Sequence, residues 1–257
     1  MNKYIINSDN DKFINTNKII NKKINFIDHI VWINLDRSIN RKENMEKILL
    51  DIEIKNTRIN AIDGKLDDVR NMICPIETKI TDCEIACTLS HIKAINYLNN
   101  LEGDYFMVCE DDISFNNIYL IDEDLETIIK NSPEFDILLL SKIYFNKLDN
   151  KYTNWTEEKN KSNDYSTTIW STGCYIISKK GVNKLCNKVS YENNIFEFNN
   201  SYIDVADLFL YTELSTYVYK YNFICTVNED STIHNDHMDY QRKSAEYQLE
   251  VIYKDFI

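Results

Sequence analysis

The chain has 257 residues, of which 44% are hydrophobic and 27% charged, proportions typical of a globular protein that buries a sizeable core. Its 29 Lys and Arg residues against 41 Asp and Glu residues give a formal net charge of −12 at pH 7. This composition excludes a disordered tail and argues against nonspecific binding to a phosphate backbone, so we expect no nucleic-acid partner.

The cysteines and the apolar runs indicate the compartment. The seven cysteines are odd in number, include no Cys-x-x-Cys pair and lie mostly in apolar runs, so we expect free thiols rather than disulfides. No segment approaches the roughly 18 to 20 apolar residues of a membrane span, and the polar N-terminus lacks a signal-peptide core. These features predict a soluble cytoplasmic protein without a transmembrane segment.

The pattern along the chain begins with a polar stretch. Residues 1–26 are rich in Asn and Lys without a sustained period, so we expect an N-terminal polar arm followed by a single domain over 27–257. Residues 29–35 form a β-branched and aromatic run typical of a buried strand. From Asn40, apolar residues recur at steps of three and four, which predicts a helix.

Strands and helices then continue to alternate. Further strands are predicted over 57–62, 105–109, 136–140, 174–178 and 221–227, and helices over 82–99, 120–130, 179–189 and 202–214. Such alternation predicts an α/β sheet covered on both faces, with ligands bound at the carboxyl ends of its strands. Polar segments near strand ends are therefore candidates for a site, and they are 34–37, Asp63, 110–112 and 171–173.

Three consecutive carboxylates follow the predicted strand 105–109. Glu110, Asp111 and Asp112 would repel one another unless they are solvated or bound to a cation, and oxygen ligands favour Mg²⁺ or Mn²⁺. In an extended chain, Glu110 and Asp112 would point to one side and Asp111 to the other. The alternative interpretation is a solvated acidic loop.

Six segments of the chain form a recognisable series. They are 33–37 together with Arg41, 61–64, 84–91, 108–113, 172–181 and 207–210. In this order they resemble the motifs of glycosyltransferase family 25, the group that contains lipooligosaccharide β-galactosyltransferases and collagen hydroxylysine galactosyltransferases. Asn40, Ala86 and the pair Val205-Ala206 depart from the residues usual in that family.

The resemblance implies a GT-A-type α/β fold, with a mixed, mostly parallel, Rossmann-like sheet flanked by helices. It also implies a UDP-sugar donor (UDP-galactose or UDP-glucose), Mn²⁺ or Mg²⁺, and a glycan or glycoprotein acceptor. The implied metal ligands are Asp112, Glu110 and His234. The implied donor-binding residues are Asn34, Asp36, Arg37, Arg41, Asp63, Ser90, His91, Glu110 and Asp111.

An inverting transfer of galactose or glucose also needs a carboxylate that takes the proton of the acceptor hydroxyl. Asp207 is the first candidate for this base, and Asp204, one turn earlier on the predicted helix 202–214, is the alternative. Asp63, followed by a Gly that permits close approach, is a candidate contact for ribose or uracil. The alternative function is a diverged, inactive module that binds a nucleotide sugar without transferring it.

Overall fold

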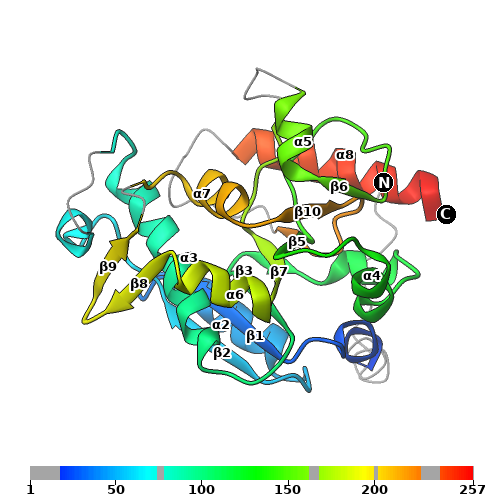
Figure 1. Cartoon of the computed structure of the whole chain (residues 1–257). Coiled ribbons are helices and arrows are strands. Elements are labelled where there is room, and N and C mark those ends of the chain that lie inside the picture. Colours follow the sequence, from blue (N-terminus) through cyan, green and yellow to red (C-terminus); the bar gives the residue numbers. More distant parts are fainter. Residues whose placement is uncertain (1–17, 74–77, 162–167, 200–201, 227–237, 257) are drawn as a thin grey trace.

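The computed structural model describes residues 18–73, 78–161, 168–199, 202–226 and 238–256, and it has an α/β architecture (Figure 1). In this described part of the chain, seven strands form one mixed sheet. Their spatial order is β2 (Asn56–Asn60), β1 (His29–Asn34), β3 (Tyr105–Glu110), β7 (Cys174–Ser178), β5 (Ile137–Leu139), β10 (Thr216–Tyr219) and β6 (Tyr152–Asn154). Only β7 and β6 of this sheet run antiparallel to the other strands, so the predicted mixed, mostly parallel sheet is confirmed.

Helices cover both faces of the sheet because successive strand residues point to opposite sides. Val31 and Ile33 of β1 pack in a core with α3 (Asp82–Asn99), α6 (Lys179–Cys186) and α7 (Ala206–Glu213). Ile30 and Trp32 pack in a second core with α2 (Ile39–Leu49), α4 (Leu125–Asn131) and α8 (Met238–Phe256). Burial on both faces explains why these strands are continuous apolar runs.

The longest predicted helix that borders the candidate site has the bounds expected from the sequence. Thr81 caps α3 with a reciprocal capping box, in which its hydroxyl accepts the amide of Glu84 and its own amide donates to the Glu84 carboxylate at 2.7 Å. The apolar stripe of the helix, including Ile85, Leu89 and Ile92, is fully buried. This cap and this stripe fix both the start and the rotation of α3.

One predicted strand is wrong. The strand of the main sheet in this part of the chain is β10, which ends at Tyr219, before the predicted range begins. Within the described residues 221–226, the short strand β11 (Cys225–Thr226) pairs with β4 (Ile113–Ser114) outside the main sheet. Phe223 and Ile224 are fully buried without belonging to a strand, so tertiary packing explains that apolar run. Val227 lies outside the described residues.

Several elements were not predicted from the sequence. One is the long helix α8, and the short ones include β4, β6, η1 (Val69–Met72), η2 (Asn116–Tyr119), α5 (Trp155–Asn160), and the hairpin of β8 (Val189–Glu192) and β9 (Ile195–Phe198), which projects at the left of Figure 1. Of the expected N-terminal arm, residues 18–24 are helical and bury Ile20 and Ile24 in the second core.

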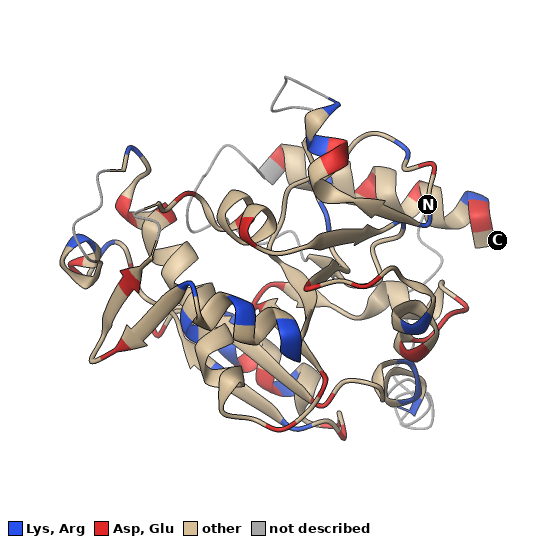
Figure 2. Cartoon of the chain, in the orientation of Figure 1, with Lys and Arg blue, Asp and Glu red and all other residues tan. Residues whose placement is uncertain are grey.

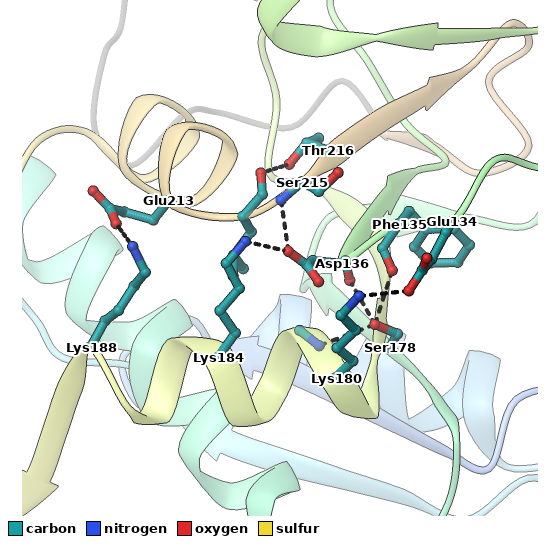
Figure 3. Close-up of polar contacts among 12 residues, drawn as sticks. Glu134, Phe135, Asp136, Ser178, Lys180, Lys184, Lys188, Glu213, Ser215 and Thr216 are labelled. Atoms are coloured by element: carbon teal, nitrogen blue, oxygen red, sulfur yellow. Dashed lines mark hydrogen bonds and ion pairs between the residues drawn. The ribbon is translucent and has the colours of Figure 1, made fainter.

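Lysines on α6, and Lys188 just after it, tie this helix to neighbouring elements. Basic residues mark successive bands of α6 (Figure 2), and Lys180, Lys184 and Lys188 pair with Glu134, Asp136 and Glu213 in that order (Figure 3). The Asp136 carboxylate is almost fully buried, and it also accepts the amide of Ser215 at 2.8 Å. These contacts join the start of β5, α6 and the loop before β10.

Two expectations about the whole chain concern thiols and membranes. The six cysteines within the described residues are all free, as predicted. None of the helices in the described ranges has the length and apolar character needed to cross a bilayer.

Candidate active site

A pocket with an open volume of about 590 Å³ lies where β1, β2 and β3 end. The three strands are adjacent and parallel, so their carboxyl ends meet at one edge of the sheet. One face of α3 forms another wall of the pocket. Eight of the nine predicted donor-binding residues line it: Asn34, Arg37, Arg41, Asp63, Ser90, His91, Glu110 and Asp111.

The ninth, Asp36, is not on the pocket wall. Its carboxylate is exposed and pairs with Arg58 at 2.6 Å and with the Asn60 amide at 2.8 Å. Arg58 also donates to the side-chain oxygen of Asn34 at 2.8 Å. Arg58 and Asn60 were missed by the sequence reasoning, although parallel pairing of β2 with β1 places them beside the predicted residues.

Arg41 lies between two of the three carboxylates. Its guanidinium is 2.6 Å from Asp111 Oδ1 and 2.7 Å from Asp112 Oδ2, and the other oxygen of Asp111 accepts the Asn34 side-chain amide at 2.6 Å. The predicted alternation of side chains is therefore wrong beyond Glu110, because residues 111–112 form a turn in which both carboxylates reach the same arginine.

The side chain of Glu110 contacts α3 and the segment that precedes β7. Its Oε1 accepts the hydroxyl of Thr172 at 2.8 Å and lies 3.5 Å from Nε2 of His91, whose Nδ1 is 3.2 Å from the Tyr175 hydroxyl. Burial opposes ionisation of Glu110, but the nearby His91 ring, the Thr172 hydroxyl and the Arg41 guanidinium together lower its pKa. Glu110 is therefore ionised, and His91 supports it from inside the core.

Asp112 carries the least compensated charge of the three. Burial and then the neighbouring Glu110 raise the pKa of Asp112 to about 7. Its Oδ1 is buried and has no hydrogen-bond partner among the described residues. An orphaned carboxylate oxygen beside a second carboxylate fits a hard divalent cation, which prefers oxygen ligands.

The protein supplies only part of a metal site. No group of three or more His, Cys, Asp and Glu side chains in the described ranges has an arrangement that could hold a metal ion. His234, the third predicted ligand, lies outside the described residues. A cation bound by Glu110 and Asp112 would therefore need further oxygen ligands from water or a bound phosphate, as is common for Mg²⁺.

Asp207 lies in the first turn of α7, next to a strained turn. Its Oδ1 accepts the backbone amide of Ser171, which has a φ of 102°. This left-handed conformation is costly for a non-glycine residue. The Ser171 carbonyl accepts the Tyr211 hydroxyl at 2.6 Å, so α7 holds the turn at two points. Burial raises the pKa of Asp207 to about 6.

Asp204 is not on the same helix face as Asp207, because α7 begins only at Ala206. The Asp204 carboxylate accepts the Tyr202 hydroxyl at 2.6 Å and the Val205 amide at 2.8 Å. Asp207 also interacts electrostatically with Glu110 and His91, which places it nearer to the acidic centre.

The loop after β2 is held against α3. Asp63 pairs with Arg37 through one oxygen and accepts the Lys65 amide through the other. Gly64 packs so tightly that a Cβ there would lie 2.5 Å from the carbonyl oxygen of Asp82. The close approach that Gly64 permits is thus to α3, and the same loop is tied to α3 where the Ile62 amide donates to Ser90 Oγ at 2.9 Å.

Comparison with solved structures gives only distant similarity. The inositol-1-phosphate CTP transferase from T. maritima is 14% identical, with a TM-score of 0.38 over 85% of this chain and 78% of that one. A nucleoside-diphosphate-sugar pyrophosphorylase from Vibrio cholerae RC9 is 11% identical, with a TM-score of 0.39 over 88% and 84% of the two chains.

Sequence comparison is more informative. A glycosyltransferase 25 family member from Drosophila pseudoobscura pseudoobscura is 25% identical over 177 residues, which cover 62% of this chain and 27% of that protein. The chain thus matches about a quarter of that relative's length. The family model described as glycosyltransferase family 25 (LPS biosynthesis protein) matches residues 27–202. The expectation from the motifs is confirmed: the chain belongs to glycosyltransferase family 25.

Proposed function

We propose that this protein is a metal-dependent, inverting glycosyltransferase that moves galactose or glucose from a UDP-sugar to a hydroxyl group of a glycan or glycosylated protein. The observation that supports this proposal is the pocket at the ends of β1, β2 and β3, which is lined by the acidic residues Glu110 and Asp111 and by the basic residues Arg37 and Arg41. It combines acidic and basic groups within reach of one bound molecule.

The donor diphosphate is an anion, so the acidic side of the pocket can hold it only through a cation. Asp112 and Glu110 would hold Mn²⁺ or Mg²⁺, and Arg37 and Arg41 are the basic groups on the pocket wall. When bound, the metal ion would act as a Lewis acid that stabilises negative charge on the departing UDP.

Asp207 is the residue that we propose as the base. Its amide contact with Ser171 fixes the carboxylate, and a pKa of about 6 leaves it ionised yet basic near neutral pH. In the proposed step, Asp207 takes the proton of the acceptor hydroxyl while that oxygen attacks the anomeric carbon. The bond from this carbon to the UDP oxygen breaks on the opposite face.

The first experiment measures UDP binding by calorimetry with Mn²⁺, and then UDP release from UDP-galactose and UDP-glucose with candidate acceptors. The family description names LPS biosynthesis, so lipooligosaccharide-type glycans are the first acceptors to test. Asp112→Ala should lower sugar transfer about a hundredfold or more while the circular dichroism spectrum stays unchanged. Asp239→Ala, at an exposed carboxylate on α8, is the matched control.

The outcomes separate the alternatives. Full transfer by Asp112→Ala would refute the metal role of this residue. UDP binding without release from any donor would instead support the inactive binding module.

A further inference from the structure

Arg41 is a positive group that already contacts Asp112, one of the two carboxylates assigned to the metal. It is in the first turn of α2, its side chain is 14% exposed, and one guanidinium nitrogen contacts both Asp111 Oδ1 and Asp112 Oδ2. The guanidinium therefore neutralises part of the charge on Asp112, which is one of the two carboxylates that a divalent cation would bind.

The two carboxylates depend on Arg41 to different degrees. Asp111 also accepts the Asn34 side-chain amide, and Asn34 is itself held by Arg58. Asp112 has a second oxygen that is buried and lacks a hydrogen-bond partner in the described ranges. If Arg41 left Asp112 but kept Asp111, only Asp112 would need a new cation.

We propose that Arg41 is an internal cation that holds Asp112 in the ligand-free protein and competes with the divalent ion for this carboxylate. Binding of the metal and the nucleotide diphosphate then moves Arg41 from Asp112 onto the diphosphate. This inference rests on the proposed function, because it requires that a metal ion and a diphosphate bind in this pocket.

The chemistry of the groups supports such an exchange. A guanidinium binds carboxylate and phosphate oxygens with the same planar set of donors, so it can trade one for the other. A guanidinium and a divalent cation on one carboxylate repel each other, which makes their binding competitive. Arg37 differs from Arg41 in this respect, because its partner is Asp63 in the loop after β2.

The test compares Mn²⁺ binding in the absence of nucleotide, measured by electron paramagnetic resonance of free Mn²⁺. Arg41→Gln should bind Mn²⁺ at least about tenfold more tightly than wild type, because the competing charge is gone. At saturating Mn²⁺, the same variant should bind UDP about tenfold more weakly by calorimetry, because a charged contact to the diphosphate is lost.

Two arginine variants serve as controls. Arg37→Gln also removes a charge from the pocket wall, but Arg37 pairs with Asp63 and not with Asp112, so any gain in Mn²⁺ affinity without nucleotide should be smaller than that of Arg41→Gln. Arg242→Gln, at an exposed pair with Asp239, removes the same net charge far along the chain and should change neither affinity. Together they separate local competition from a general change in charge.

A second substitution of Arg41 keeps the inference testable if Arg41→Gln fails to fold, as a thermal melt would show. Arg41→Lys retains the charge, so its Mn²⁺ affinity should stay within about threefold of wild type. Arg41→Lys that binds Mn²⁺ tenfold more tightly would overturn the inference.

One result would overturn this inference but not the proposed function. In it, the wild-type protein binds UDP and Mn²⁺, and Arg41→Gln binds Mn²⁺ no more tightly than the wild type. Wild-type protein that binds no UDP even with saturating Mn²⁺ would overturn the proposed function itself.

Discussion

Replacing Asp207 with asparagine should stabilise the ligand-free protein near pH 8 while abolishing sugar transfer. The substitution keeps an oxygen that can accept the Ser171 amide, and it removes a partly buried negative charge near Glu110. The proposed base therefore experiences the repulsion of a second carboxylate, at some cost in stability.

The magnitude follows from the pKa of Asp207, which burial raises from 3.8 to about 6. A carboxyl whose pKa is higher in the folded state contributes stability that is fully present below its unfolded pKa and is lost as the pH rises through about 6. At about 1.4 kcal/mol per pH unit, the ionised group costs up to about 3 kcal/mol near pH 8. Near pH 5 the cost, and therefore the gain from asparagine, is about half as large.

Urea denaturation of the wild type and Asp207→Asn near pH 8 and pH 5 measures this gain. Asp204→Asn is the control, since it makes the same chemical change three residues away at a carboxylate bonded to Tyr202 and Val205. A loss of stability in Asp207→Asn near pH 8, or a gain of equal size at both pH values, would refute the reasoning.

Three further perturbations test the framework and the chemistry. Gly64→Ala places a Cβ 2.5 Å from the Asp82 carbonyl, so it should destabilise the fold by about 1–3 kcal/mol in urea and weaken UDP binding by shifting α3. Asp136→Ala removes the buried carboxylate that accepts from Lys184 and Ser215, and it should cost about 2–3 kcal/mol in the same assay with no change in Mn²⁺ affinity. The wild-type rate of transfer should rise with pH and reach half its maximum near the Asp207 pKa of about 6. A transfer rate that does not change between pH 5 and pH 7 would contradict the assignment of Asp207 as the base.

The half of the pocket formed by β1, β2 and β3 could be predicted from the sequence because it follows from local pattern and direction. Apolar runs indicate the strands, the intervening helical pattern requires parallel neighbours, and parallel strands bring Asn34, Asp63 and Glu110 to one edge. The sequence pattern did not give the contact of Arg58 with Asn34, which depends on the register between two strands. It also failed for the turn at 111–112, where tertiary pairing with Arg41 replaces strand geometry.

The other half of the site depends on a strand that runs the opposite way. The polar segment 171–173 precedes β7, so in a parallel sheet it would lie at the far edge from Glu110. Because β7 is antiparallel to β3, the start of β7 lies beside the end of β3, and the Glu110 amide donates to the Gly173 carbonyl at 3.0 Å. The same turn then reaches Glu110 through Thr172 and Asp207 through Ser171, so one reversed strand joins the acidic motif to the proposed base.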